Sequence, residues 1–290
     1  MTLIAFLTCQ RFPQGFEDDL TALEPLRRHG IEVQAAVWDD PKVDWESFEA
    51  IIIRSTWDYY QQPEAFRAWL DQIEARGMTL LNPVDLIRWN MDKRYLRELQ
   101  GRGITVIPSE WVDPGAPVDL RTVLQTRGWS EAVIKPAVSA GAWQTQRVSL
   151  SDLGSAQVQV DQILQDRAVI IQQFRPEVMH EGEWSFLFFN GVFSHAVLKQ
   201  PPAGDFRVQA GTMQLISADP AVLKQAQAVV GALDMPPLYA RVDGVISNGE
   251  FQLMELEVFE PCLYLRTDPT SAQRFADAVA ARVQVPPKKA

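Results

Sequence analysis

The stretch LMELEVFEP, residues 253–261, places two carboxylates on one face of a predicted strand. Strand side chains alternate between the two faces, so Glu255 and Glu257 point the same way. Leu253 and Phe259 are expected on that face too, which argues against a solvated surface. Side chains two apart on a strand lie about 7 Å apart, and apolar surroundings strengthen the repulsion between their charges. We therefore expect a positively charged group between the two glutamates.

The preceding strand of the same hairpin offers a third carboxylate, Asp243. Mg²⁺ takes oxygen ligands and is commonly held by one or two carboxylates together with substrate phosphates. A two-residue turn at 248–249 would place Asp243 opposite Met254, facing away from the glutamates. A three-residue loop at 247–249 would place Asp243 opposite Leu253 and on the same face as the two glutamates. The metal interpretation requires that all three carboxylates share this face. We therefore predict the three-residue loop. The candidate magnesium ligands are Asp243, Glu255 and Glu257.

The composition excludes several classes of partner. The chain has 290 residues, of which 47% are hydrophobic, and this allows a large buried core and one or two domains. Lys and Arg number 27 and Asp and Glu number 37, so the net charge is −10. This balance argues against binding to nucleic acid or to an anionic membrane. An anionic small ligand remains open, because a local basic cluster or a bound cation can override the net charge.

The two cysteines, Cys9 and Cys262, indicate a reduced, cytoplasmic protein. They are too few for a disulfide framework and too far apart in sequence for a metal site. Cys262 follows the acidic strand, but no histidine accompanies it in a nucleophile motif, so we interpret it as a packed thiol. Residues 1–12 lack a basic segment and contain only a short apolar run, which predicts a first strand and not a signal peptide. No run approaches the length of a membrane span.

The first ninety or so residues alternate between strand and helix patterns. Strands are predicted at 3–9, 31–38, 50–56 and 78–82, and helices at 16–30 and 63–77. Pro25 should kink or delay the first of these helices. The alternation is a βαβ pattern, which predicts a parallel sheet.

The rest of the chain has a mixed pattern with long antiparallel ribbons. Further helices are predicted at 92–103, 156–166, 219–234 and 268–283, strands at 132–138, 144–150 and 168–174, and ribbons at 183–199 and 240–258. Each ribbon turns at an Asn-Gly pair, which is a strong hairpin signal. The PPKK segment near the C-terminus is expected to be a frayed tail. We predict an α/β domain at 1–88 and two α+β domains, at 89–170 and 171–290.

Candidate phosphate-binding residues lie outside any known phosphate loop, because the chain has neither a P-loop motif nor a G-x-G-x-x-G after the first strand. Lys135 sits inside an apolar strand, directly before the small residues of the 139–141 loop, whose backbone can approach a phosphate closely. A lysine on an edge strand is the alternative interpretation. Lys93, Lys199 and Arg207 are individually uninformative, but together they supply cations to complement the acidic strand.

An ordered series of motifs extends over nearly the whole chain. The segments are WNMDKRYL…GITVIP, VIKPAVSAGAW, IIQQFRPEV, GEWSFLFFNGVFSHAVLK, DFRVQ, RVDGV and MELEVFEP, between residues 89 and 261. In this order they resemble the ATP-grasp superfamily, in its glutathione-synthetase-like branch. RSTWDYY at 54–60, WNMDKRYL and FSHAVLK are most similar to the cyclo-ligases of D-cycloserine biosynthesis, which close O-ureido-serine using ATP. The resemblance implies an N-terminal βαβ (pre-grasp) domain and two α+β lobes that enclose the nucleotide.

The resemblance also implies roles for individual residues. Those expected to contact ATP are Lys93 and Lys135 (phosphates), Ser139 and Gly141 in the covering loop, Gln172, Gln173, Phe174 and Arg175 (adenine hinge), Glu183 with Lys199 beside it (ribose), and Arg207 (γ-phosphate and acyl group). Asp243, Glu255 and Glu257 match the magnesium ligands. Many relatives have Glu-x-Asn where this chain has Glu255-Leu-Glu257, which keeps an oxygen donor and adds a negative charge.

A substrate site is expected where the strand at 50–56 ends, since α/β sheets tend to bind ligands at such edges. Arg54 could pair with a substrate carboxylate, while Ser55, Trp57 and Asp58 could shape the pocket. For Trp57 the alternative is packing at a domain interface. Arg266 is a further substrate candidate.

The expected function is an ATP- and Mg²⁺-dependent carboxylate–amine ligase that acts through an acyl phosphate, either within one small molecule or between two. Its partners would be a small carboxylate substrate and an amine nucleophile, and a homodimer is compatible with the sequence. One alternative is a ligase that adds an amino acid to a peptide or protein tail. Another is a nucleotide-binding sensor without turnover, which the intact Lys93, Lys135, Arg207, Asp243 and Glu255 argue against.

Overall fold

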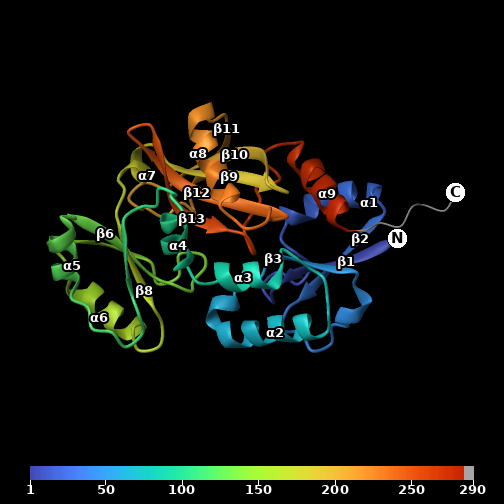
Figure 1. The fold of residues 1–290 in the computed structure, drawn as a ribbon, viewed down its shortest axis with the longest axis horizontal. Coiled ribbons are helices and arrows are strands. Elements are labelled where there is room, and N and C mark those ends of the chain that lie inside the picture. The colour runs from blue at the N-terminus through green and yellow to red at the C-terminus, as the bar shows by residue number, and fades with distance from the viewer. Residues whose placement is uncertain (284–290) are drawn as a thin grey trace.

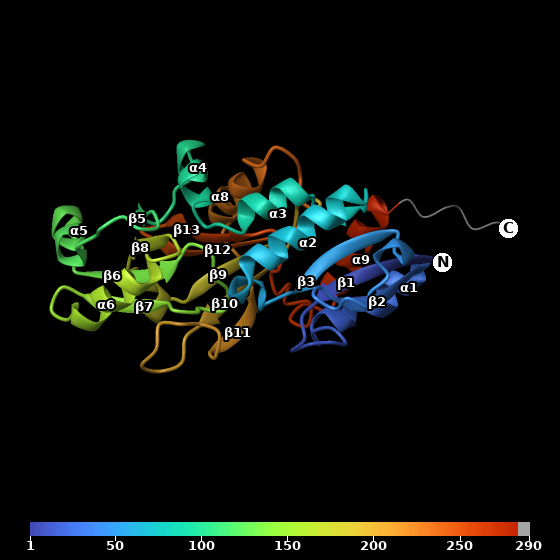
Figure 2. The same cartoon turned by 90° about the horizontal axis from the view of Figure 1, so that it is seen from below.

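Three β-sheets organise the chain, as the computed structural model shows for residues 1–283 (Figure 1). The PPKK segment predicted to fray lies outside the described residues. The first sheet occupies one end of the molecule and the second sheet the other end, and the third sheet lies between them (Figures 1 and 2). In residues 1–283, no helix is both long and apolar enough to cross a bilayer.

The first sheet is parallel, as the βαβ pattern predicted. Its order is β2-β1-β3-β4, with β1 at Thr2–Thr8, β2 at Ile31–Val37, β3 at Ala50–Ser55 and β4 at Leu80–Leu81. Helices α2 (Pro63–Ala75) and α3 (Val84–Asn90) lie on one side of it, and α1 (Leu23–Arg28) and α9 (Ser271–Arg282) on the other (Figure 1). Short 3₁₀ helices stand at Asp19–Ala22 (η1), Trp45–Ser47 (η2) and Tyr59–Gln61 (η3).

The predicted helix at 16–30 is shorter than expected. A 3₁₀ turn, η1, precedes α1, whose first turn contains Pro25. Proline lacks an amide hydrogen and is tolerated only in the first turn of a helix, so the α-helix begins just before it. α9 packs on this helix and on β1, with the rings of Phe6 and Phe275 6.3 Å apart. The end of the described chain therefore joins the core of the N-terminal domain.

The second sheet is antiparallel. Its order is β5-β8-β6-β7, with β5 at Ser109–Val112, β6 at Glu131–Pro136, β7 at Gln146–Ser149 and β8 at Val169–Gln173. Helices α5 (Leu120–Arg127) and α6 (Gly154–Ile163) share its apolar core. β5 and α5 are additions to the predicted elements. The predicted domain boundary at 170/171 falls inside β8, which belongs to this sheet as a whole.

The third sheet carries the two ribbons and the acidic strand. Its order is β11-β10-β9-β12-β13, with β9 at Glu183–Phe189, β10 at Val192–Gln200, β11 at Thr212–Ile216, β12 at Tyr239–Ser247 and β13 at Glu250–Glu257. Its helices are α8 (Pro220–Gly231), α7 (Glu177–His180) and α4 (Tyr95–Gly101). Tyr95, Leu96 and Leu99 of α4 lie in the core of this sheet, although α4 precedes the second sheet in sequence.

Candidate functional site

A pocket of about 580 Å³ lies between the second and third sheets and extends to loops of the first. Most of the residues singled out from the sequence line it. These are Trp57, Lys93, Lys135, Ser139, Gly141, Gln172, Gln173, Phe174, Arg175, Glu183, Lys199, Arg207, Asp243, Glu255 and Glu257. They come from all three predicted domains, so the fold gathers them from about 200 residues of sequence.

The turn of the acidic hairpin consists of two residues. Ser247 pairs with Glu250, which leaves only Asn248 and Gly249 between the strands. Their φ angles are 53° and 81°, as a type I′ turn requires. The predicted three-residue loop is therefore wrong: Asn-Gly prefers the two-residue turn, whose twist matches that of the flanking strands.

A β-bulge in β13 places Asp243 on the same face of the hairpin as Glu255 and Glu257, which is the arrangement that the three-residue loop was expected to give. Gly244 pairs with Leu253 and Asp243 with Glu255, so Met254 is the extra residue. The expectation that Asp243 shares the face of the glutamates is thereby confirmed, and all three line the pocket. A Cβ on Gly244 would lie 2.3 Å from a backbone carbonyl oxygen of β13. Glycine is thus required where the bulged strand approaches its neighbour.

The bulge also reverses the alternation along β13. Leu253 and Leu256 are both buried in the core of the third sheet, whereas Glu255 and Glu257 face the pocket. The prediction that Leu253 lies on the face of the glutamates is wrong, because one extra residue shifts every side chain before it to the opposite face.

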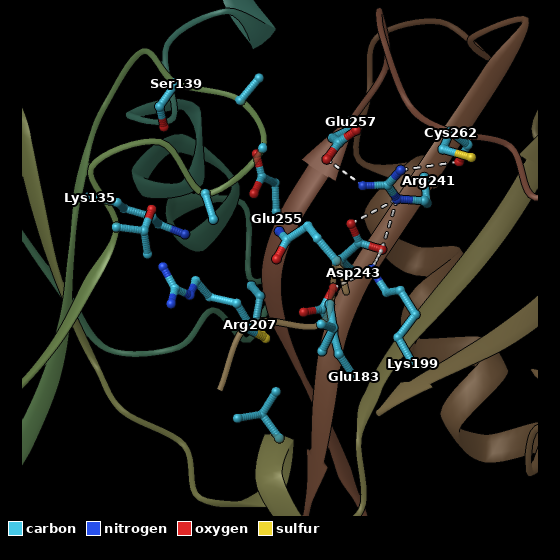
Figure 3. A pocket seen from close by; sticks show the side chains of 18 of the residues that line it. Lys135, Ser139, Glu183, Lys199, Arg207, Arg241, Asp243, Glu255, Glu257 and Cys262 are labelled. Atoms are coloured by element: carbon cyan, nitrogen blue, oxygen red, sulfur yellow. Dashed lines mark hydrogen bonds and ion pairs between the residues drawn. The ribbon is translucent and has the colours of Figure 1, made fainter. Parts of the chain in front are cut away.

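Part of the positive charge expected near the glutamates comes from an arginine that was not predicted from the sequence. Arg241 on β12 is 7% exposed. Its Nε donates to both oxygens of Asp243, at 3.1 and 2.9 Å, and its other nitrogens contact Glu257 and the Cys262 carbonyl oxygen (Figure 3). The available signal was its place two residues before Asp243, hence on the same strand face.

Negative charge still exceeds positive charge on this face. Burial raises the pKa of Glu257 to about 7, with Arg241 opposing the rise and Glu255 and Asp243 adding to it by repulsion. For Glu255, burial acts in the same direction, but Lys93 outweighs it and holds the pKa below its usual value. An additional cation would therefore stabilise the ionised cluster.

Two buried lysines approach the pocket from the side of the second sheet. The Lys93 ammonium lies 3.1 Å from Glu255 and donates to the Ser139 carbonyl oxygen at 2.5 Å. Lys135, on β6, is 8% exposed and makes no ion pair or side-chain hydrogen bond with any residue in 1–283. Burial accordingly lowers the pKa of Lys135. A buried ammonium without an anionic partner is suited to an anionic ligand.

A second ion pair stands on the third sheet. The Lys199 ammonium lies 2.5 Å from Glu183 and 3.6 Å from Asp243, which also accepts a hydrogen bond from Ser185 at 2.5 Å. In Figure 3 Glu183, Lys199 and Asp243 lie on the opposite side of the pocket from Lys135. Glu183 keeps one oxygen free of hydrogen bonds with the described residues, so it could accept one from a ligand hydroxyl.

Two loops border the pocket. Ser139 is held by a hydrogen bond to the Pro136 carbonyl oxygen at 3.0 Å, while Gly141 adopts a φ of 59°. Arg207 lies in the loop between β10 and β11, is exposed, and pairs with Asp205 at 3.0 Å. An exposed arginine on a loop can change partners at little cost.

An apolar slot lies where β8 leads into the third sheet. Phe174 is packed with Ile107, Val178 and Val208, and the Arg147 guanidinium lies 3.8 Å from the centre of its ring. The backbone N–H groups of Gln173 and Phe174 donate to protein carbonyl oxygens at 2.8 and 3.2 Å. If backbone atoms of this segment recognise a nucleobase, they would therefore do so through a carbonyl oxygen or through an N–H group after residue 174.

The donor chemistry fits a magnesium ion with two protein carboxylates better than with three. In residues 1–283, no three His, Cys, Asp or Glu side chains are arranged to hold a metal ion. Asp243 is engaged by two cations, Arg241 and Lys199, and its role as a third ligand stays a prediction. Glu255 and Glu257 each face one cation in the pocket and offer the oxygen donors that Mg²⁺ prefers beside phosphates.

Four predicted substrate residues lie outside the pocket. Arg54 is 1% exposed, and it bonds to Asp19 at 2.8 Å and to the Pro261 carbonyl oxygen at 2.8 Å. The expectation that Arg54 pairs with a substrate carboxylate is contradicted, because its guanidinium is already satisfied inside the protein. The other three are also engaged elsewhere: Ser55 with Thr8, Asp58 with Trp38, and Arg266 with Glu17 at the surface.

Trp57 does reach the pocket, at its N-terminal end. Its Nε1 donates to the Glu260 carbonyl oxygen at 2.8 Å, and its ring packs edge-on against Phe12 and Phe16. Both interpretations offered for Trp57, pocket wall and interface packing, therefore apply. Cys262 lines the pocket as well, but burial and the nearby Asp18 raise the pKa of its thiol to about 12, which argues against a nucleophile.

Comparison with known proteins identifies the family. A family model described as the N-terminal domain of D-cycloserine synthetase DcsG matches residues 4–82. The cycloserine biosynthesis protein DcsG of Streptomyces lavendulae is 33% identical over 277 residues, which cover 90% of this chain and 92% of that protein.

Solved structures agree. The crystal structure of D-cycloserine synthetase DcsG has a TM-score of 0.87 at 31% identity, with 97% of this chain and 100% of that chain covered. D-alanine–D-alanine ligase from Bacillus anthracis complexed with ATP has a TM-score of 0.69 at 16% identity, over 98% of each chain. The structure of ATP-grasp ligase PsnB complexed with a minimal precursor, Mg and ADP has a TM-score of 0.63 at 16% identity, with 97% of each chain covered. These two distant likenesses show the fold alone. The chain therefore belongs to the family of D-cycloserine synthetase DcsG, and it shares the fold of ATP-grasp ligases.

Proposed function

We propose that this chain uses ATP to convert a substrate carboxylate into an acyl phosphate, which a nitrogen of the same molecule then attacks. Membership in the DcsG family makes it an ATP-grasp ligase that forms C–N bonds. The observation that carries the nucleotide assignment is Lys135. Its buried ammonium has no anionic partner in the described chain and lies across the pocket from the acidic strand.

The pocket offers complementary groups for each part of ATP. The apolar slot around Phe174 would take the adenine ring, and Glu183 would accept a hydrogen bond from the ribose. Lys135 and Lys93 would hold the phosphates, and the backbone of the 139–143 loop could close over them. Glu255 and Glu257 would hold Mg²⁺. When bound, that ion would neutralise phosphate charge and draw electron density from the transferring group.

The chemical step then follows from the arrangement of charge. A carboxylate oxygen of the substrate attacks the γ-phosphorus, the bond to the β-γ bridging oxygen breaks, and ADP leaves. A substrate nitrogen next attacks the acyl carbon, loses a proton, and inorganic phosphate departs. Arg207 would turn from Asp205 to the transferring phosphoryl group, and later to the oxyanion. Loss of such a donor typically costs about 3 kcal/mol of transition-state stabilisation.

The substrate class is proposed from the family. The DcsG relatives are named for cycloserine biosynthesis and D-cycloserine synthesis, so we propose a small amino-acid derivative such as O-ureido-serine, closed to a ring. Neither a peptide substrate nor a bare sensor role is favoured by a feature of the pocket. A cytoplasmic location accords with the two free cysteines, and a homodimer stays a prediction.

The test is turnover with trapping of the intermediate. The protein is incubated with Mg-ATP and either O-ureido-serine or a panel of amino acids and peptides, and ADP, AMP and phosphate are measured. ADP with phosphate, a ring product, and an acyl hydroxamate on addition of hydroxylamine support the proposal. Turnover only when a second amine or a peptide is supplied favours an intermolecular ligase. Nucleotide binding without any turnover favours a sensor, and AMP with pyrophosphate excludes the acyl-phosphate route.

A matched pair of lysine variants ties the turnover to the pocket. Lys135→Met should lower kcat/KM for ATP by about a hundredfold or more. Lys224→Met, at an exposed position on α8, should leave it unchanged. Equal activity of the two variants would remove the main support for this nucleotide site.

A further inference from the structure

One buried carboxylate has no role in the proposed function. Glu260 follows β13, lines the pocket and is 6% exposed. Its carboxylate makes no hydrogen bond or ion pair with any residue in 1–283. The other carboxylates that line this pocket, Asp243, Glu183, Glu255 and Glu257, each pair with a lysine or an arginine. Burial of an unpaired carboxylate is costly, and burial together with the nearby Glu257 raises the pKa of Glu260, so a cationic ligand beside it would favour its ionised form.

The surroundings of Glu260 indicate which part of a ligand it would meet. Its carbonyl oxygen accepts a hydrogen bond from Trp57, and the Trp57 ring lies 4.8 Å from Phe16 and 5.4 Å from Phe12 between ring centres. All three rings line the pocket. This aromatic wall comes from the first domain, whereas the groups assigned to ATP come from the second and third sheets. The Glu260 backbone thus adjoins this wall, while its carboxyl group lies within electrostatic reach of Glu257, Lys93 and Glu255, between the wall and the groups assigned to ATP.

Aromatic faces and a carboxylate are the two groups that recognise an organic ammonium ion. The proposed reaction requires an amino acid whose carboxylate is activated, and in such a molecule the ammonium is attached to the neighbouring carbon. The α-amine cannot attack its own acyl carbon without closing a strained three-membered ring, and a carboxylate that keeps it protonated also prevents attack on the acyl phosphate of a second molecule. Attack is then left to the other nitrogen of the substrate.

We propose that Glu260 binds the α-ammonium group of the amino-acid substrate against the wall formed by Phe12, Phe16 and Trp57. Glu260 is thereby a specificity-determining residue that selects amino acids over simple acids and protects the α-amine. This inference rests on the proposed function, because it takes the substrate carboxylate to be the activated group. A competing role for Glu260 is that of an additional magnesium ligand beside Glu257, and the test separates the two.

The test compares two probes by calorimetric titration with the whole protein, Mg²⁺ and a non-hydrolysable ATP analogue. The probes are O-ureido-serine, in each enantiomer, and 3-(ureidooxy)propanoic acid, which lacks only the α-amine. The wild type should bind one enantiomer of the amino acid more tightly than the simple acid, by a factor on the order of tenfold to a hundredfold, as for a hydrogen bond between charged groups. Glu260→Gln should abolish that preference, and Glu250→Gln, at an exposed position beside the hairpin turn, should retain it.

Three results would overturn the inference: equal or undetectable binding of both probes by the wild type, an unchanged preference in Glu260→Gln, or a shift in the Mg²⁺ concentration needed for nucleotide binding in that variant. The last result would indicate a metal ligand. Circular dichroism of Glu260→Gln should match the wild type, and the affinity for the ATP analogue should be unchanged. Selective binding without ADP formation by the wild type would instead contradict the proposed function and leave the role of Glu260 in place.

Discussion

Arg241 is expected to be the most important single side chain for the stability of the site. Its guanidinium joins Asp243 and Glu257, whose side chains are 4% and 19% exposed. Replacement by Met keeps the apolar part of the side chain but leaves two carboxylates near each other without their shared cation. Removal of one partner of a buried ion pair typically costs about 3–5 kcal/mol. Because Asp243 retains Lys199 and Glu257 is partly exposed, we expect a loss near the lower end, about 3 kcal/mol.

The loss should depend on pH, with a sign that follows from the pKa of Glu257. Burial and neighbouring carboxylates raise this pKa to about 7 even with Arg241 opposing the rise, so in Arg241→Met it should be higher still. A carboxyl group whose pKa is raised by folding contributes stability below its unfolded pKa and loses that contribution as pH rises through the folded value. The stability difference between wild type and Arg241→Met should therefore be larger at pH 8 than at pH 5.

The assay is urea unfolding followed by tryptophan fluorescence at pH 5 and pH 8, with EDTA present. Arg266→Met is the control, since its ion pair with Glu17 is 55% and 70% exposed and should change the free energy of unfolding by less than about 0.5 kcal/mol. Adding Glu257→Gln to Arg241→Met should recover part of the loss at pH 8. A loss below about 1 kcal/mol, or the same loss at both pH values, would refute the assignment of Arg241 as the shared cation.

Three further outcomes follow from single positions. Lys135→Met, which costs activity, should leave the free energy of unfolding of the nucleotide-free protein unchanged or higher, because it replaces an unpaired buried ammonium with an apolar side chain; a marked loss in urea unfolding would show that Lys135 has a structural partner. Gly244→Ala should destabilise by about 1–3 kcal/mol in the same assay, since its Cβ would lie 2.3 Å from a carbonyl oxygen, and wild-type stability would contradict the bulge. With a thiol pKa of about 12, Cys262 should react with iodoacetamide at pH 8 at least about tenfold more slowly in the native protein than in urea; equal rates, measured by mass spectrometry, would contradict the raised pKa of the thiol.

Local patterns in the sequence determined most of the elements, and the resemblance to the ATP-grasp superfamily supplied most of the residues expected in the pocket. Asn-Gly pairs and alternating apolar residues predict both ribbons, and the βαβ pattern predicts the parallel sheet. Lys135 could be singled out because a charged residue inside an apolar strand is unusual, and the neighbouring residues alone show that it is unusual. These inferences succeed because backbone preferences and side-chain periodicity act over a few residues.

The tertiary structure alone decided which charges meet. One bulge at Met254 brings Asp243 opposite Glu255 and turns Leu253 into the core, and pairing geometry of this kind has no short-range signal. Arg54 looked available from its place at a strand end, yet Asp19, 35 residues earlier in the chain, satisfies its guanidinium. Whether a charged side chain serves a ligand or the protein depends on its partners after folding, and those partners come from distant segments.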